Sequence, residues 1–537
     1  MDTADLIIVG AGSAGCVLAH RLSADPQRRV VLLEAGGADR HPLIAVPLAW
    51  TSAMTLPAIG WGYTSEPEAA SGGRSLPMPR GRVLGGTSSI NGMMYTRGNP
   101  GDYDAWAARG LPGWDYASVL PYFQRAESNW RGAGRYHGDA GPLTVGRHPQ
   151  DPFLTPKLFA TAERLGYRIL GDFAGPEAVG FGIPDFTIRG GRRLSTARAY
   201  LAPARGRGNL RVLTGAQVTR VLLEGGRATG VEYVRSGRRE VLHGGEVILA
   251  AGAFDSPRLL MLSGIGPAEH LREVGVEVRH ALPGVGGNLQ DHPLIPLVYA
   301  AAGPYALHEL LRLDRLALAG LQWALLGRGP LTHMPLAAQG FVKLDAAAAW
   351  PDTQFQVSAV SMLARPWFPL WRQSAGHHFT ATALQLRPQG RGDIRLQSAD
   401  PLAPPRIRLG LLQHEADRRA VRGMIRFVRQ FFATEPAASL VRAELAPGAA
   451  AASDAELDAY ARGMLMTGMH PTSTCAMGVG PEAVVDAELR VHGIEGLRVV
   501  DGSVMPVIVS GNTNAPIIMI AEKAADLVLG RAPPPAA

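Results

Sequence analysis

The most constraining feature of this sequence is a short apolar strand, residues 6–9, that runs directly into a glycine-rich turn at Gly10, Gly12 and Gly15. A helix-like segment follows the turn, and a second apolar strand then ends in Glu34. A strand, three spaced glycines, a helix and a carboxylate about 20 residues farther on are typical of a dinucleotide-binding α/β fold. The sequence therefore predicts a Rossmann-like domain around this turn.

Each glycine of the turn has a separate physical role. Gly10 allows the tight turn, Gly12 lets the backbone approach a diphosphate, and Gly15 lets the helix pack close to the strand. The positive end of the helix then faces the phosphates. A ribose-binding carboxylate suits FAD and NAD equally, so the motif predicts a dinucleotide without choosing between them. The residues expected to contact it are Gly10, Gly12, Ser13, Ala14, Gly15, Glu34 and Ala35.

Length and composition limit the remaining possibilities. A chain of 537 residues predicts two domains, or a cofactor domain with a second domain built into it. The net charge is +7, but nearly all of the positive charge is arginine, with lysine only at Lys157, Lys343 and Lys523. No lysine-rich stripe suggests a nucleic-acid partner. Cys16 and Cys475 provide neither a disulfide framework nor a metal-binding spacing, so no metal is expected.

The first residues and the apolar runs of the chain indicate where in the cell the protein is expected. The first strand begins within a few residues of Met1, which leaves no room for a secretory signal peptide. The leucine-rich stretch 307–326 carries four charged residues, so no transmembrane segment is expected. We therefore expect a cytoplasmic protein.

Two long segments, residues 79–94 and 252–266, resemble the signature sequences of the glucose-methanol-choline oxidoreductases, a family of FAD enzymes. The resemblance extends over nearly the whole chain and is weakest over 303–454. It implies that the dinucleotide is FAD. Some members of the family attach FAD covalently through a histidine in the first signature. Ile90 occupies that place here, so the resemblance implies FAD that is bound non-covalently.

The first signature also makes chemical sense on its own. Gly85 and Gly86, followed by the hydroxyl residues 87–89, offer backbone N–H groups and hydroxyls to a diphosphate or to the flavin pyrimidine edge. The alternative for this segment is an ordinary Ser/Gly turn without a ligand. For the expected contacts outside the signature, the alternative is ordinary packing at the end of a strand. The further FAD contacts that the resemblance implies are Arg82, Val83, Gly86, Thr87, Asn91, Gly92, Met93, Met94, Val218, Ala251, Asp501, Gly502, Asn512 and Thr513.

Oxidation of an alcohol by a flavin requires loss of the hydroxyl proton and transfer of a hydride to flavin N5. A base near the substrate oxygen and a hydrogen-bond donor serve the first requirement. His470 precedes a Pro-Thr-Ser-Thr loop and matches the active-site histidine of the family, so it is the candidate base. Asn514 is the candidate partner, at the start of a helix where it can also act as a cap. Because asparagine cannot act as a base, we expect His470 alone to accept the proton.

The expected fold class is α/β, with a Rossmann-like FAD-binding domain and a substrate domain built on an antiparallel sheet backed by helices. Alternating runs at 354–360 and 379–386 predict two strands of that sheet, and 415–432 predicts an amphipathic helix on its back. The expected FAD-binding domain comprises residues 1–148, 196–298 and 462–537, and the substrate domain comprises 149–195 and 299–461.

The sequence of the predicted substrate domain limits the class of substrate. Choline enzymes of the family are expected to need a carboxylate and aromatic side chains around the trimethylammonium group. Residues 329–342, the segment in which such a carboxylate is expected, contain neither Asp nor Glu. An apolar pocket or lid suited to aromatic or aliphatic primary alcohols is expected instead, although ordinary core packing explains its candidate residues almost as well. These residues are Met334, Met362, Trp367, Phe368 and Trp371.

The predicted reaction is oxidation of a primary alcohol to the aldehyde, with either O2 or an external acceptor taking the electrons from FAD. A hydroxynitrile lyase, a fatty-acid photodecarboxylase and a choline dehydrogenase all resemble this family and are alternatives. A flavin-binding protein without turnover is a further one. The candidate pair of His470 and Asn514 favours oxidation. The sequence leaves open whether the protein forms a homo-oligomer.

Overall fold

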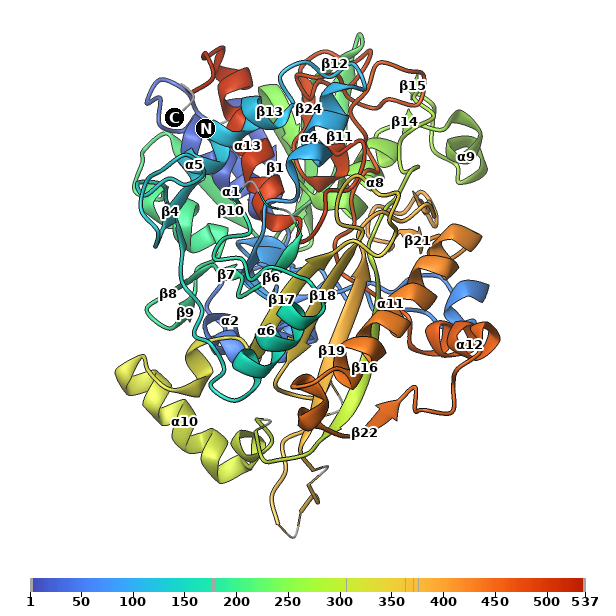
Figure 1. The fold of residues 1–537 in the computed structure, drawn as a ribbon. Helices are drawn as coiled ribbons and strands as arrows, with labels where there is room; N and C mark the ends of the chain where they lie inside the picture. Colours follow the sequence, from blue (N-terminus) through green and yellow to red (C-terminus); the bar gives the residue numbers. More distant parts are fainter. Residues whose placement is uncertain are drawn as a thin grey trace.

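The computed structural model describes residues 3–534 except 176, 178, 306, 363, 370 and 375. Two large sheets organise these residues, one in the upper and one in the lower half of Figure 1. The upper sheet has seven strands in the order β10-β2-β1-β13-β12-β11, with β24 beside β13. Its strands are β1 (Thr3–Val9), β2 (Val30–Glu34), β10 (Leu210–Thr214), β11 (Ala216–Glu224), β12 (Arg227–Arg235), β13 (Arg238–Leu249) and β24 (Leu497–Val499).

The parallel part of this sheet positions the predicted dinucleotide site. Strands β10, β2, β1, β13 and β24 pair in parallel, and every residue of β2 is buried, as expected for a parallel sheet covered on both faces. The glycine turn follows β1, and Asp501 follows β24 by two residues. The carboxyl ends of the parallel strands therefore meet at one edge, where α/β sheets bind their ligands.

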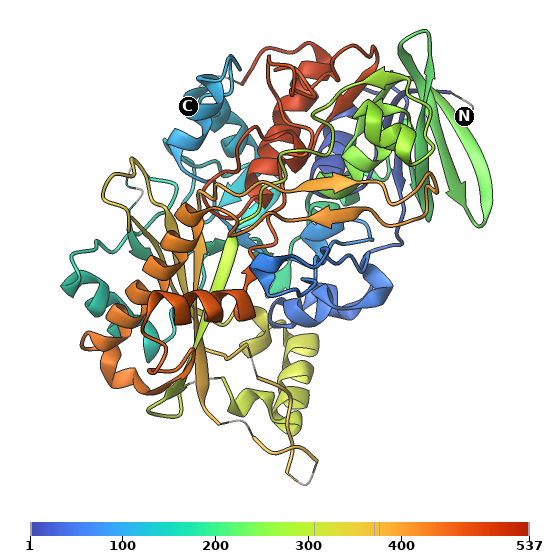
Figure 2. The same ribbon diagram turned by 90° about the vertical axis from the view of Figure 1, so that its right-hand side faces the viewer.

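Helices pack closely around this edge. α1 (Ser13–Leu22) lies beside α13 (Asn514–Leu529), and α5 (Tyr116–Ala126) packs against α13. α8 (Gly252–Leu262) follows β13 and contacts β11. The antiparallel pairing of β11, β12 and β13 extends the sheet away from the site, toward the upper right of Figure 2.

The lower sheet is antiparallel throughout, in the order β22-β16-β19-β18-β17-β6, with β23 beside β16. This confirms the predicted fold class and both predicted strands, because β18 and β19 occupy the two alternating runs. The strands are β6 (Gly180–Gly182), β16 (Pro293–Ala301), β17 (Leu336–Val342), β18 (Thr353–Ser358), β19 (His378–Gln385), β22 (Val441–Ala446) and β23 (Met466–Thr467).

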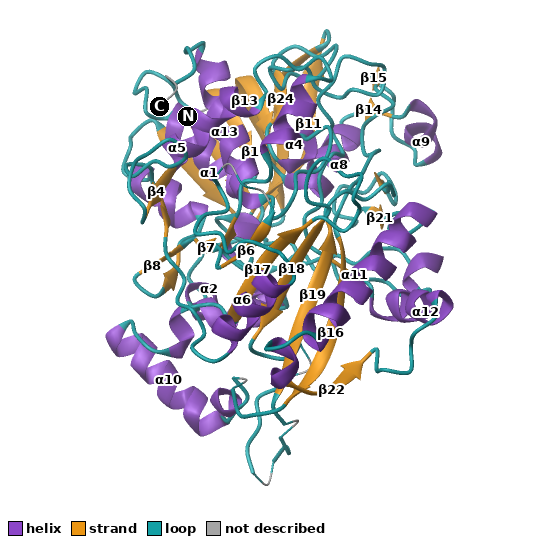
Figure 3. Ribbon diagram, viewed as in Figure 1, coloured by secondary structure: helices purple, strands orange, loops and turns teal. Residues whose placement is uncertain are grey.

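Helices cover the lower sheet and extend below it (Figure 3). The predicted amphipathic helix is α11 (Glu415–Ala433), which packs on β19 and β16 through a face of buried aliphatic and aromatic residues. α6 (Leu154–Arg164) packs on β17 and β6, and α12 (Asp454–Met464) packs on α11. α10 (Leu313–Leu326) projects at the lower left of Figure 1.

Short helices and strands complete the fold around these two sheets. In the described parts of the chain, no helix combines the length and apolarity needed to cross a membrane. The remaining α-helices, and the remaining strands of more than two residues, are α2 (Pro42–Ala45), α3 (Trp50–Met54), α4 (Pro100–Ala107), α7 (Ala202–Ala204), α9 (Ala268–Glu273), β4 (Glu127–Asn129), β5 (Leu143–Val145), β20 (Asp393–Arg395) and β21 (Arg406–Arg408).

Candidate active site

A cavity of about 1210 Å³ lies between the carboxyl edge of the upper sheet and strands β18 and β19 of the lower sheet. Its volume exceeds the ~300–1,000 Å³ of an ordinary small-molecule pocket. The glycine turn lines one end, and His470 and residues of β18 and β19 line the other. This single cavity therefore has room for a dinucleotide and a second molecule.

The dinucleotide end has the shape that the glycine turn predicts. A Cβ atom added at Gly12 would project into the cavity, with its nearest atom, the Ala250 carbonyl oxygen, 3.9 Å away. A Cβ at Gly15 would instead lie 1.8 Å from the Gly10 oxygen, so Gly15 serves helix–strand packing. No side chain caps α1, which leaves its first backbone N–H groups available to an anion. These donors suit a diphosphate.

Two carboxylates brace this end of the cavity. Glu34 accepts hydrogen bonds from the backbone N–H groups of Ala11 (2.9 Å) and Gly36 (2.7 Å), and its burial raises its pKa to about 7. Asp501 accepts from the N–H of Gly252 (2.8 Å) and joins β24 to α8. Both side chains also line the cavity, where a ribose hydroxyl would meet them.

His470 lies at the other end, on a loop that pairs with the segment before β16. The N–H of Gly468 donates to the carbonyl of His292 (2.7 Å), and the N–H of His470 donates to a carboxylate oxygen of Asp291 (2.9 Å). Met469 has a φ of 62°, a left-handed conformation that is uncommon for a non-glycine residue. The backbone of the loop is thus held by tertiary contacts in an unusual conformation, which is frequent at functional sites.

Both ring nitrogens of His470 have partners. Nδ1 lies 3.0 Å from Nδ1 of His292, and Nε2 lies 3.0 Å from the amide nitrogen of Asn512. The amide oxygen of Asn512 accepts from the Thr96 hydroxyl (3.3 Å) and from Gln354 (3.4 Å). This oxygen therefore points away from the histidine, and the NH2 group of Asn512 points toward it.

These contacts set the tautomer of His470. Because Asn512 donates to Nε2, that nitrogen carries a lone pair and the proton resides on Nδ1, which donates to His292. Burial lowers the pKa of His470 well below its ordinary value, and His292 and Arg80 lower it further. Burial also lowers the pKa of His292 to about 3. Both rings are therefore neutral at neutral pH, and Nε2 of His470 is a proton acceptor on the cavity wall.

The structure corrects the predicted partner of His470. The prediction was Asn514, but Asn512 makes the contact, whereas Asn514 accepts a hydrogen bond from the Ser13 hydroxyl (2.7 Å). Helix α13 begins at Asn514, with Thr513 as its N-cap, so Asn514 is not the cap either. The side chain of Asn514 turns toward the start of α1 because the two helices pack side by side.

Most of the predicted FAD contacts line the cavity, and three do not. Gly15 packs against β1, and Val83 is buried in a small apolar cluster. Arg82 lies over the ring of Trp61, 4.9 Å from its centroid, and bonds Gln217. The predicted contacts in the lining are Gly10, Gly12, Ser13, Ala14, Glu34, Ala35, Gly86, Thr87, Asn91, Gly92, Met93, Met94, Val218, Ala251, Asp501, Gly502, Asn512 and Thr513.

Sequence analysis missed several polar residues around His470, at its end of the cavity. His292 and Asp291 come directly before β16, and Gln354 lies on β18. The only local signal was an Asp-His pair at the start of an apolar strand, and such a pair is usually structural. Arg80 belongs to the first signature, and it donates to the carbonyl of Met469 (2.8 Å).

Only two of the five residues predicted for an apolar pocket or lid lie in the described lining. Met334 and Met362 line the cavity, but Trp367, Phe368 and Trp371 are absent from its described lining. Trp367 stacks on the ring of His308 instead.

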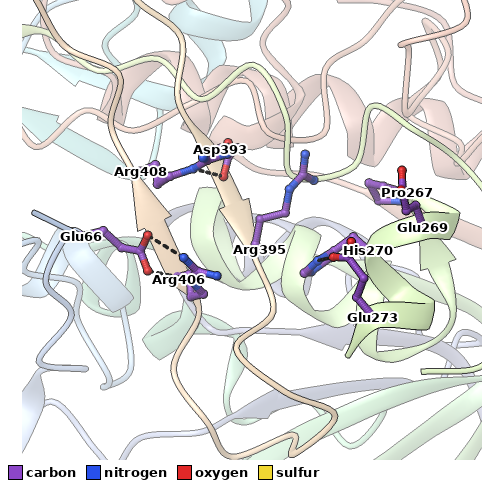
Figure 4. Close-up of a pocket in the computed structure, with 9 residues that line it drawn as sticks. All are labelled: Glu66, Pro267, Glu269, His270, Glu273, Asp393, Arg395, Arg406 and Arg408. Carbon is purple, nitrogen blue, oxygen red and sulfur yellow. Dashed lines mark hydrogen bonds and ion pairs between the residues drawn. The ribbon is translucent and has the colours of Figure 1, made fainter. Parts of the chain in front are cut away.

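A second pocket, of about 320 Å³, shares no lining residue with the large cavity (Figure 4). Its carboxylates and arginines largely neutralise one another, since Glu66 pairs with Arg406 and Asp393 pairs with Arg408. Its chemistry is that of an ion-paired surface, so the large cavity is the candidate active site.

A dinucleotide cradle that faces a buried, neutral histidine is the arrangement of an oxidoreductase that uses a dinucleotide cofactor. The family model for GMC oxidoreductases matches residues 4–294 and 388–521, and the chain belongs to that family. It is a flavoprotein that uses FAD and acts on CH–OH donors.

Several relatives cover the whole chain. An oxygen-dependent choline dehydrogenase from Brucella ovis is 41% identical over 99% of this chain and 96% of its own length. The crystal structure of pyridoxine 4-oxidase from Mesorbium loti has a TM-score of 0.88 and 32% identity, covering 98% of this chain and all of that one. A fungal aryl-alcohol oxidase has a TM-score of 0.84 and 27% identity, with 99% of each chain covered.

Proposed function

We propose that this protein oxidises an apolar primary alcohol to its aldehyde, with His470 accepting the hydroxyl proton. The observation that carries the proposal is the lone pair on Nε2 of His470, which Asn512 and His292 fix on the wall of the cavity. The lyase alternative and a flavin protein without turnover do not account as directly for a neutral base held in this way beside a flavin site.

Bound FAD supplies the acceptor for the hydride that leaves the substrate carbon. The substrate hydroxyl replaces the Asn512 NH2 group as the hydrogen-bond donor to Nε2 of His470, and Nε2 then takes the hydroxyl proton. The displaced NH2 group donates a hydrogen bond to the substrate oxygen as negative charge develops on it. His292 holds the His470 ring through Nδ1 and thereby keeps the proton off Nε2, so that Nε2 presents a lone pair. Burial of this site limits competition from water.

The lining of the substrate end favours an apolar alcohol. Glu34, Asp255 and Asp501 are the carboxylates of the described lining, and each already bonds its own neighbours near the glycine turn or α8. A trimethylammonium group would therefore find no free carboxylate there. The apolar side chains of the substrate end include Leu294, Leu307, Leu331, Met334, Leu336, Met362 and Leu384.

Choline oxidation is the second candidate, because relatives at 41% identity are named as choline dehydrogenases. A substrate panel separates the two functions. We expect kcat/KM for benzyl alcohol and medium-chain primary alcohols to exceed that for choline by at least about 100-fold, or ~2.7 kcal/mol. Comparable values, or a preference for choline, would overturn the proposed substrate class.

Asn512 and Asn514 have different expected roles. Asn512→Ala removes the donor beside Nε2, so flavin reduction by alcohol slows about 10- to 100-fold while FAD stays bound. Asn514→Ala removes the acceptor of the Ser13 hydroxyl at the dinucleotide end, so it weakens FAD binding more than it slows reduction. Stopped-flow reduction and FAD titration of both variants test this assignment, and the reverse pattern would restore Asn514 as the catalytic partner.

The depressed pKa of His470 determines how the rate of flavin reduction should change in acidic buffer. The neutral ring accepts the proton, and a pKa well below 6.5 keeps the ring neutral above that pH. The rate constant for flavin reduction is therefore expected to stay level from pH 8 to pH ~6.5 and to fall only in more acidic buffer. A limb with a midpoint above pH 7 that disappears in His470→Gln would show that the pKa is not depressed.

Other properties are inferences of the same kind. Ile90 is buried in an apolar cluster and offers no nucleophile, so FAD should be released when the protein is denatured. Two free, buried cysteines suit the cytoplasm.

The domain boundaries given above stay a prediction. The same holds for the electron acceptor, which is O2 or another molecule, and for a homo-oligomeric state. Strands β16 and β23 of the lower sheet begin inside ranges that were assigned to the FAD-binding domain.

A further inference from the structure

Helix α10 is apolar on both of its long faces, although only one of them packs against the protein. Ala319 and Trp323 are buried on the inner face. The outer face carries Leu318, Leu321 and Leu325, spaced three and four residues apart, and these side chains are 68%, 60% and 79% exposed. A helix that is apolar all round is usually buried in a core or a membrane. The outer face is therefore exposed, although its apolar residues suit burial in a core or a membrane.

The loop beside α10 adds large apolar side chains to the same end of the molecule. Trp367 anchors this loop to the start of the helix, because its N–H donates to the Leu311 carbonyl and its carbonyl accepts from the N–H of Leu313, both at 3.0 Å. In Figure 1 the helix and this loop form the lowest part of the molecule. We define the leucine face as Leu318, Leu321, Leu325, Leu326, Phe368 and Trp371, all of them exposed.

The charges around the leucine face are predominantly basic. Glu309 and Asp314 are each neutralised by an arginine at the start of α10. Arg328, Arg365 and Arg372 form no ion pair with any carboxylate that the structure describes. Exposed apolar side chains bordered by unpaired arginines suit a surface of anionic lipid, because the apolar groups insert and the arginines reach the headgroups.

The helix and loop that carry the leucine face also contribute residues to the lining of the cavity. Leu310, Leu311 and Leu316, from the segment that leads into α10 and from its first turns, line the cavity. Arg365 and Pro366, from the anchored loop, line it as well. One short helix and one loop therefore separate the apolar cavity from the apolar exterior. A substrate dissolved in lipid would have a short path to the active site.

We propose that the leucine face lies in the headgroup–acyl boundary of a lipid bilayer and that apolar alcohols enter the cavity from the membrane. The entry step rests on the proposed function, whereas membrane binding does not. α10 has 14 residues, short of the ~20 that span a bilayer, so it lies in the interface instead of crossing it. A symmetric contact between two copies of this face would bring the two sets of unpaired arginines together, which disfavours a dimer through it.

Vesicle flotation of the FAD-bound protein tests the proposal. The wild type is expected to float with vesicles of phosphatidylcholine and phosphatidylglycerol, and less with phosphatidylcholine alone. The double variant Leu321→Glu/Leu325→Glu should lose at least tenfold in the bound-to-free ratio. Val479→Glu is the matched control, because Val479 is 77% exposed and lies outside the leucine face, and it should float like the wild type.

The outcomes separate membrane binding from catalysis. All three proteins should keep their FAD and oxidise a short, water-soluble alcohol at equal rates, while only the double variant slows on a long-chain alcohol supplied in vesicles. Failure of the wild type to float, or flotation of the double variant at wild-type level, would overturn membrane binding even if the enzyme oxidises alcohols. A dimer that the double variant converts to monomers, without flotation of the wild type, would assign the leucine face to a second copy.

Discussion

Replacing His470 with glutamine is expected to leave FAD bound and to slow flavin reduction by a primary alcohol by about 10²–10⁴-fold. Glutamine can fill the space and keep a polar contact with Asn512, but it cannot accept a proton. The expected loss is therefore confined to the chemical step, which anaerobic stopped-flow mixing of enzyme and alcohol measures directly. The FAD content of the purified variant should equal that of the wild type.

His243→Gln is a control for this variant, because His243 is exposed on β13, away from the cavity lining. It should reduce its flavin at the wild-type rate. If His470→Gln did so too, the assignment of the base would be wrong. His292→Gln is expected to act more weakly, since His292 positions the ring without contacting the substrate.

A second large effect is expected at the glycine turn. Gly12→Val places a branched side chain in the space that receives the diphosphate, where the nearest protein atom to the new Cβ is 3.9 Å away. The backbone at Gly12 is extended, with φ −78° and ψ −160°, so valine is tolerated there. We expect the FAD-free variant to fold with a nearly unchanged Tm, and we expect the variant to bind FAD at least about 100-fold more weakly, or ~2.7 kcal/mol.

Gly15→Ala is the matched variant for packing. Its added Cβ would lie 1.8 Å from the Gly10 oxygen, so helix α1 must move away from β1. We expect this variant to lose stability by about 1–3 kcal/mol or more, and to lose FAD only as a consequence. Equal effects of the two substitutions on the Tm of the FAD-free protein would show that Gly12 also serves packing, which would contradict the cradle assigned to it.

The parts that the sequence predicted well depend on local rules. The strand, glycine turn, helix and Glu34 follow from backbone sterics and from the geometry of parallel strands. The two strands at 354–360 and 379–386 and the helix at 415–432 follow from the periodicity of apolar side chains, and β18, β19 and α11 confirm them.

The parts that it missed depend on tertiary packing. Asn512 and Asn514 are two residues apart, and only the observed start of α13 decides which of them faces His470. His292 and His470 are 178 positions apart, so no local pattern brings them together. The composition of the segment 367–371, which is rich in aromatic residues, suggested a pocket. The direction of these side chains depends on the conformation of the loop, which the sequence alone does not give.

The central claim is that an apolar primary alcohol gives its hydride to FAD in this cavity. The most direct measurement is anaerobic addition of a medium-chain primary alcohol to the purified FAD-bound protein, followed by the visible absorbance of the oxidised flavin. The account predicts that the flavin bleaches fully and that one equivalent of aldehyde forms per flavin. Flavin that stays oxidised across a broad panel of alcohols would contradict it.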